Sequence, residues 1–179
     1  KHPLSNKETP LNEAIIQERY LLEPISSKAD LRIDTSATNV HQLRDLIKSR
    51  VKTADKQGIS IMFESFGFKH GVPINADFVF DVRCLPNPHW VPELRALTGA
   101  DEAVINYLDE YDEVKEMLSD ILNFIDKWIP HFEADNRSYM TIAIGCTGGQ
   151  HRSVYFVNKL AKTIKNKHNT VLSSHREIT

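Results

Sequence analysis

The stretch best suited to chemistry is 145–154, GCTGGQHRSV, which follows an apolar run and precedes a helical pattern. A helix that begins after a glycine-containing turn leaves its first amide groups unpaired, and the helix dipole makes that end positive. The adjacent Gly148 and Gly149 let a bound group approach the main chain closely. His151 and Arg152 add side-chain donors. We therefore predict an anion-binding loop here.

The spacing of Cys146 and Arg152 leaves a second chemistry open. Cys-x5-Arg is the spacing found in cysteine-dependent phosphatases, and a helix N-terminus with a nearby arginine favours the nucleophilic thiolate. Such an enzyme also needs an acid for its leaving group, for which Asp77 or Asp81 could serve. Against this alternative, Gly145 stands where those enzymes usually have a histidine. A buried structural cysteine is the competing interpretation.

Two further polar stretches follow apolar strand patterns. DVRCLPNPHW, 81–90, places Asp81 and His89 beyond a strand, in a loop that its prolines make rigid. Because ligands of open α/β sheets bind beyond the carboxyl ends of strands, this loop and 145–154 would form one pocket. FESFGFKHGVP, 63–73, is either core followed by a turn or a wall of the same pocket.

Basic side chains gather towards the end of the chain, whereas 101–120 is acidic. Both stretches could simply be solvated faces of the protein. The alternative is a surface that tracks an RNA backbone. Its candidate residues, three of them at three-residue spacing on one helical pattern, are Lys159, Lys162, Lys165, Lys167 and Arg176.

Strand and helix patterns alternate along the chain. Apolar runs predict strands at 29–36 (ending in a helix cap), 59–68, 78–85, 138–145 and 169–174. Helical spacing of apolar residues predicts helices at 11–22, 39–51, 101–109, 111–133 and from 154 onward. This alternation predicts an α/β fold with a mainly parallel sheet and flanking helices. The polar, glycine-terminated stretch 52–58 predicts a boundary between domains 1–54 and 55–179.

The composition favours a cytoplasmic protein. The chain has 179 residues, a net charge of −2 and two cysteines, without CxxC pairs or a close Cys/His ligand cluster. This pattern argues against disulfides and structural zinc, so we expect no metal. We find no secretory signal at the start and no apolar run long enough to cross a bilayer, and we expect no membrane partner.

The chain resembles the RapZ (YvcJ-like) family of RNase adapter proteins from end to end. The resemblance is carried by the opening HPLS…LLEP…ADLRIDTS, by FESFGFKHGVP, by FDVRCLPNPHW and by NRSYMTIAIGCTGGQHRSV. It implies an N-terminal P-loop domain that binds and hydrolyses ATP or GTP. It also implies a C-terminal domain similar to a sugar-phosphate-binding subdomain of phosphofructokinase, which binds small regulatory RNA and glucosamine-6-phosphate. Family members assemble as homotetramers and present the RNA to RNase E, which controls glucosamine-6-phosphate synthase.

Carried over by position, the resemblance implies a phosphosugar pocket without catalytic residues. Its members would be Asp81, His89, Cys146, Thr147, Gly148, Gly149, His151 and Arg152. Cys146 would then line the pocket rather than attack a substrate. The chain departs from the family pattern in two ways: it has no GxxxxGK[ST] motif, and it ends without a strongly basic run. We therefore expect residues 1–54 to be the remnant of a P-loop domain that holds no nucleotide cofactor. For RNA we expect either that a basic tail has been trimmed or that binding is weaker and relies on the lysine helix.

Overall fold

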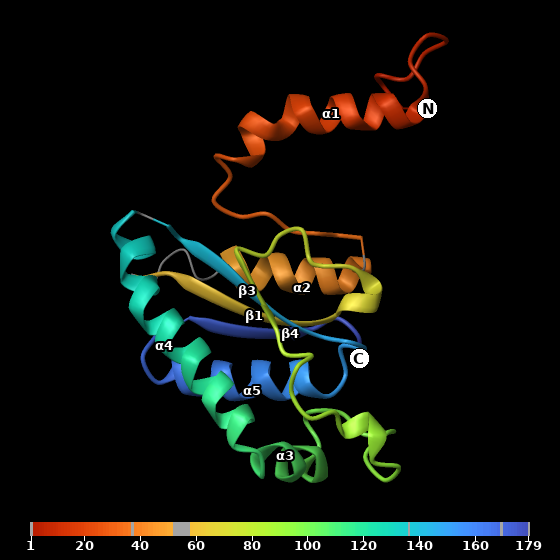
Figure 1. The fold of residues 1–179 in the computed structure, drawn as a ribbon. Helices are drawn as coiled ribbons and strands as arrows, with labels where there is room; N and C mark the ends of the chain where they lie inside the picture. Colours follow the sequence, from red (N-terminus) through yellow and green to blue (C-terminus); the bar gives the residue numbers. More distant parts are fainter. Residues whose placement is uncertain (1, 37, 52–57, 136, 169, 179) are drawn as a thin grey trace. The chain divides into compact units, whose positions relative to one another are not determined.

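The computed structural model describes residues 2–36, 38–51, 58–135, 137–168 and 170–178 (Figure 1). The chain divides into two compact units, Lys1–Arg32 and Ile33–Thr179. The domain boundary predicted between residues 54 and 55 lies within 52–57, outside the described residues, and stays a prediction.

The first unit is built around one helix, α1 (Leu11–Ser26), which confirms the helix predicted at 11–22 and extends it. Pro10 precedes the first turn, and the ring of His2 pairs with Glu18 on the helix at 2.9 Å. Much of the apolar surface of α1 is exposed within the chain. These exposed side chains are Leu11, Ile15, Ile16, Tyr20, Leu21, Leu22 and Ile25.

The strand predicted at 29–36 is wrong. These residues form an irregular segment, in which Asp34 accepts a hydrogen bond from the amide of Ser36 at 2.9 Å. Apolar residues become a strand only where another strand pairs with them, and none of the described strands pairs with this segment. The predicted helix follows as α2 (Val40–Val51). Its cap is Asn39, whose side chain and amide exchange hydrogen bonds with Gln42 at 2.9 and 2.8 Å.

The second unit contains a four-stranded sheet in the order β2-β3-β1-β4. Its strands are β1 (Ser60–Gly67), β2 (Phe78–Asp81), β3 (Tyr139–Cys146) and β4 (Val171–His175). All three neighbouring pairs are parallel, which confirms the predicted α/β class. β2 ends four residues earlier than predicted because the chain turns after Val82, with the amide of Leu85 bonded to the Val82 carbonyl.

Helices cover both faces of the sheet (Figure 1). α4 (Asp112–Ala134) and α5 (Arg152–Lys165) lie on one face, and α2 lies on the other. α3 (Glu102–Asp109) precedes α4, and short 3-10 turns follow β1 (η1, Phe68–His70) and β2 (η2, Pro88–Trp90). No helix in the described part of the chain is both long enough and apolar enough to cross a membrane.

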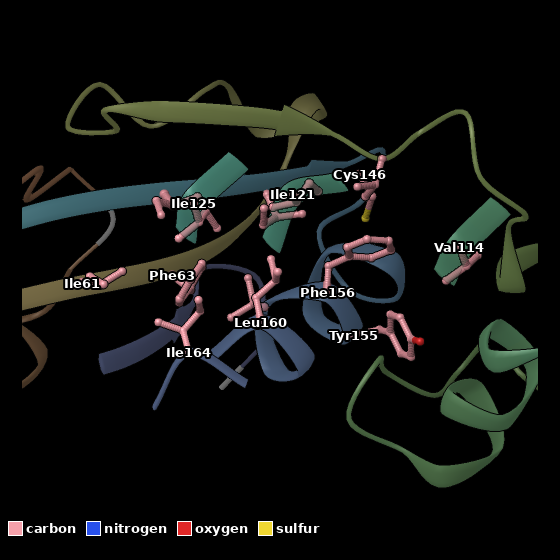
Figure 2. Packing of buried hydrophobic residues seen from close by; sticks show 14 of the residues in the cluster. Ile61, Phe63, Val114, Ile121, Ile125, Cys146, Tyr155, Phe156, Leu160 and Ile164 are labelled. Atoms are coloured by element: carbon pink, nitrogen blue, oxygen red, sulfur yellow. The ribbon is translucent and has the colours of Figure 1, made fainter. Parts of the chain in front are cut away.

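The core lies between the sheet and the α4–α5 layer (Figure 2). Ile61 and Phe63 of β1 face α5, where Phe156, Leu160 and Ile164 are fully buried. The opposite face of β3 is packed differently. A Cβ on Gly145 would collide with the rings of Phe68 and Phe66, so only glycine fits beneath them.

The strand register brings three loops to one edge of the sheet. Gly67 at the end of β1 is level with Cys146 at the end of β3, and Asp81 at the end of β2 is level with Gly145. The loops that follow these strands therefore start side by side. This is the carboxyl edge, where parallel α/β sheets bind their ligands.

Candidate anion-binding site

The loop after β3 folds back over the end of β1. A Cβ on Gly67 would lie 2.7 Å from the carbonyl carbon of Gly148 and 3.0 Å from the amide nitrogen of Gly149. Gly149 has φ +78°, in the left-handed region that glycine adopts without strain. Glycine at both positions is thus required by close backbone contact and by turn geometry. The exposed part of the loop is Thr147, the partly buried Gly148 and Gln150.

The start of α5 is covered on one side by the segment 94–100. The amide of Gly99 donates to the Gln150 carbonyl at 2.8 Å, and a Cβ on Gly99 would collide with the His151 carbonyl. The His151 ring is buried and bonds to the Leu94 carbonyl at 3.1 Å. Burial lowers the pKa of His151, which keeps this ring neutral near pH 7. The structure therefore places His151 in a supporting position and not at the open surface of the loop.

Arg152 holds two loops together. Its side chain is only 3% exposed, and Nη1 donates to the carbonyls of Arg83 and Leu85 at 2.7 and 2.8 Å. Nη2 reaches Thr147 Oγ1 at a long 3.4 Å, and no described residue accepts a hydrogen bond from the buried Nε. Burial lowers the pKa of Arg152. The guanidinium supplies positive charge beneath the loop and fixes the neighbouring 83–85 segment.

The sulfur of Cys146 faces the core and not the pocket (Figure 2). Cys146 is 3% exposed, and its Sγ accepts from the amide of Gly149 and contacts Ser153 Oγ, both at 3.2 Å. A phosphatase nucleophile must reach a substrate phosphorus, and this sulfur is enclosed. Because Gly145 lies beneath two phenylalanine rings, a histidine would not fit there either.

Asp81 and His89 lie in the neighbouring loop. Asp81 accepts two-pronged hydrogen bonds from Arg83 at 2.7 to 3.0 Å, and these bonds lower the pKa of Asp81. Arg83 also stacks on Phe68, 3.9 Å from its ring centre. His89 is exposed, with its ring centre 6.3 Å from that of His151. Asp81 is thus an ionised acceptor at the end of β2.

Lys69 lies in the stretch 63–73, which the sequence left open as core followed by a turn or as a wall of the pocket, and the structure places its side chain beside the loop. Its amide donates to the Thr147 carbonyl at 3.3 Å, and its Nζ would lie 3.9 Å from a Cβ on Gly148. The side chain is exposed, so the ammonium group is available beside the loop. The signal was its place two residues after β1, because β1 and β3 are adjacent parallel strands whose following loops must meet.

The five basic residues expected to bind RNA do not form one surface. Lys159 pairs with Asp109 at 2.9 Å, and Lys167 pairs with Asp126. Arg176 follows the carboxyl end of β4 and donates to the Gly71 carbonyl, so it lies at the opposite edge of the sheet from the end of α5. Lys162 and Lys165 are exposed on α5, and neither forms an ion pair with a described residue.

The geometry brings together exposed main chain at Thr147–Gly148, the Lys69 ammonium, the Arg152 guanidinium beneath them and the Asp81 carboxylate. This set can hold an anionic group, with a carboxylate beside it for a hydroxyl or an amine. In the described part of the chain no group of three or more His, Cys, Asp or Glu residues could hold a metal ion.

Comparison with known families agrees with this fold. A family model described as the RapZ C-terminal domain matches residues 59–179, and one described as the RapZ-like N-terminal domain matches residues 1–55. The chain belongs to the RapZ family. The two family models together cover the sheet-bearing part of the chain and the residues that precede it.

Three relatives from other bacteria carry the name nucleotide-binding protein. The protein from Cellvibrio japonicus is 56% identical over 178 residues, which is 99% of this chain and 60% of the relative. The protein from Nitrosococcus oceani is 55% identical over 179 residues, 100% of this chain and 63% of the relative. The protein from Saccharophagus degradans is 52% identical over 178 residues, which is 99% of this chain and 61% of the relative. The chain thus spans about three fifths of these relatives.

Proposed function

We propose that this RapZ-family chain is a non-catalytic sensor and adapter. It binds glucosamine-6-phosphate at the carboxyl edge of the sheet and a small regulatory RNA through α5. It presents that RNA to RNase E and so controls glucosamine-6-phosphate synthase. The relatives' printed name supports nucleotide binding by the whole protein, which we propose to be ATP or GTP binding and hydrolysis outside these 179 residues.

The observation that carries the proposal is the loop at Thr147–Gly148, flanked by Lys69 and underlain by Arg152. A phosphoryl group has three acceptor oxygens, which suit unpaired amides and an ammonium group. Asp81 lies beyond the neighbouring strand end and remains ionised, so it can accept from a sugar hydroxyl or pair with a sugar ammonium. Because the Cys146 sulfur is enclosed, the site is proposed to bind and not to hydrolyse.

Isothermal titration with glucosamine-6-phosphate tests this site. Arg152→Ala is a poor variant because it would strip the Arg83 and Leu85 carbonyls of their donor and disturb the fold. Lys69→Ala removes an exposed ammonium beside the loop and should weaken binding about tenfold. The matched control is Lys115→Ala, an exposed lysine on α4 paired with Asp112, which should bind normally.

Comparing ligands separates the two halves of the site. Glucose-6-phosphate should bind more weakly than glucosamine-6-phosphate if Asp81 pairs with the ammonium, and Asp81→Asn should remove that difference. Unphosphorylated glucosamine should not bind. Absence of binding by all three sugars to the wild type, or equal affinity in Lys69→Ala, would exclude the proposed site.

The remaining parts of the proposal concern the whole protein. We propose that it acts in the cytoplasm as a homotetramer, with RNase E and the RNA as partners. Light scattering coupled to gel filtration of the full-length protein measures its assembly, and a mass other than that of four chains would contradict the tetramer.

A further inference from the structure

The end of β4 is fixed to the sheet edge by an internal histidine. His175 Nδ1 lies 2.9 Å from Ser65 Oγ on β1, and Nε2 lies 3.2 Å from Asn158 Oδ1 on α5. An amide oxygen only accepts, so Nε2 carries the proton and Nδ1 accepts from the Ser65 hydroxyl. Burial lowers the pKa of His175, which favours this neutral form.

The next residue continues along the same edge. The amide of Arg176 donates to the Ser65 carbonyl at 3.1 Å, and its Nη1 donates to the Gly71 carbonyl at a long 3.4 Å. The chain after β4 therefore crosses the end of β1 towards the loop that follows β3.

Glu177 then meets the anion-binding loop directly. Its carboxyl carbon lies 2.8 Å from the position that a Cβ on Gly149 would occupy, and Oε2 lies closer still. Oε2 is buried, and it has no hydrogen-bond partner among the residues that the structure describes. The same holds for Oε2 of Glu64 on β1. A buried carboxylate oxygen without a donor is costly, so the hydrogen bonds of the preceding His175 and Arg176 must offset the cost of this contact.

The negative charge of Glu177 also acts on the nearby carboxyl group of Glu64. Burial raises the pKa of Glu64, and the charge of Glu177 adds to that rise while Arg176 opposes it. The anion-binding loop is therefore packed against a carboxylate that repels other negative charge nearby.

We propose that His175, Arg176 and Glu177 form a latch that competes with anion binding at Thr147–Gly149. The proposal rests on the proposed phosphosugar site and assigns its regulation. Gly148 and Gly149 are neighbours, and consecutive Cα atoms are about 3.8 Å apart. An anion on the Gly148 main chain therefore lies well within the Debye length of about 8 Å from Glu177.

The competition has a reciprocal consequence. A phosphoryl group in the loop disfavours the docked latch, and release of the latch strengthens phosphoryl binding by the same factor. Because Arg176 belongs to the latch, ligand binding at the loop also releases this basic side chain from the sheet edge.

Two measurements on the same proteins test the latch. Glu177→Gln keeps the shape of the side chain and removes its charge, and Glu116→Gln, on the exposed face of α4, is the matched control. In titrations with glucosamine-6-phosphate we expect Glu177→Gln to bind about three- to tenfold more tightly than wild type, and Glu116→Gln to bind as wild type does. In hydrogen exchange followed by mass spectrometry, ligand should speed exchange of residues 175–178 several-fold in wild type and much less in Glu177→Gln.

The outcomes separate the latch from the site itself. If wild type and Glu177→Gln bind equally, or if ligand leaves exchange at 175–178 unchanged in wild type, the latch is wrong and the phosphosugar site stands. If neither protein binds, the site and the latch fall together.

Discussion

At Gly148 and Gly149 the same added methyl group should have different effects. A Cβ on Gly148 would meet nothing closer than Lys69 Nζ at 3.9 Å, whereas Gly149 has φ +78° and its Cβ would lie 2.7 Å from the amide nitrogen of Gly67. We expect Gly148→Ala to fold normally but to weaken glucosamine-6-phosphate binding about tenfold, because its methyl group blocks close approach to the main chain. Gly149→Ala should lose about 2–4 kcal/mol of unfolding free energy.

Urea denaturation and isothermal titration of the two variants distinguish these effects. Equal destabilisation by both substitutions would show that the Gly148 position is not open, and undiminished binding by Gly148→Ala would place the ligand elsewhere.

Glu64 should make the fold more stable in acid than at neutral pH, as far as its own ionisation is concerned. Its pKa in the fold is raised above the ordinary value of 4.5, mainly by burial. The folded chain therefore binds the proton more tightly than the unfolded chain, so ionisation costs stability. That cost is absent below about pH 4.5 and is complete once the pH exceeds the raised pKa. We expect Glu64→Gln to gain about 1 kcal/mol at pH 8 and nothing at pH 4.

Urea denaturation at the two pH values gives the comparison, with Glu116→Gln as the exposed control. A gain that is equal at both pH values would attribute the effect to packing and not to charge.

At the scale of elements, α5 presents only part of the basic surface that its sequence predicts. Lys159 and Lys167 are paired with aspartates, so Lys162 and Lys165 are the two candidates on α5 for the proposed contact with RNA phosphates. We expect the double variant Lys162→Ala/Lys165→Ala to weaken RNA binding and to reduce the slope of log affinity against log salt by about 1.4–1.8. Filter binding over a salt series measures this, and Lys115→Ala on α4 should leave the slope unchanged.

The attachment of β4 should weaken in mild acid. The pKa of His175 lies below its ordinary value of 6.5, so the unfolded chain takes up a proton that the folded chain resists. Stability from this residue is complete above about pH 6.5 and is lost as the pH falls through the lowered pKa. His151 has a shift of the same sign, so His175→Gln should remove only part of the loss. Urea denaturation from pH 7.5 to 5.5 should show a loss of about 1 kcal/mol in wild type, and equal losses in wild type and His175→Gln would contradict the assignment.

The sequence predicted these elements better than it predicted the directions of side chains. Apolar runs and helical spacing located every strand of the sheet, since each buries a face against a helix. The strand predicted at 29–36 was wrong because pairing depends on a neighbour that no local pattern reveals. β3 is buried on both faces, so its near-continuous apolar run hides which residues share a face. The sequence therefore left open whether Cys146 faces the core or the pocket, and whether the stretch with Lys69 is a wall of that pocket. The approach of Glu177 was not predicted, because it depends on strand order.

At the scale of the whole molecule, nucleotide chemistry should lie outside these 179 residues. A P-loop uses a glycine-rich turn followed by a lysine and a hydroxyl residue to hold phosphates and magnesium, and the sequence has no such motif. We expect no ATP or GTP turnover by this chain in a phosphate-release assay. Turnover that is abolished by Lys69→Ala or Gly148→Ala would instead give the anion-binding loop a catalytic role.

The strand order β2-β3-β1-β4 has a consequence for biosynthesis. β1 is a central strand, yet both of its neighbours, β3 and β4, are encoded far downstream of it. While the ribosome is still translating the long α3–α4 region, neither strand that pairs with β1 has been made. The apolar residues of β1 therefore stay exposed during this time. Sheet assembly must therefore begin late in translation, after Tyr139–Cys146 has left the exit tunnel, and slow parallel pairing over such separations prolongs the exposure of apolar strand residues.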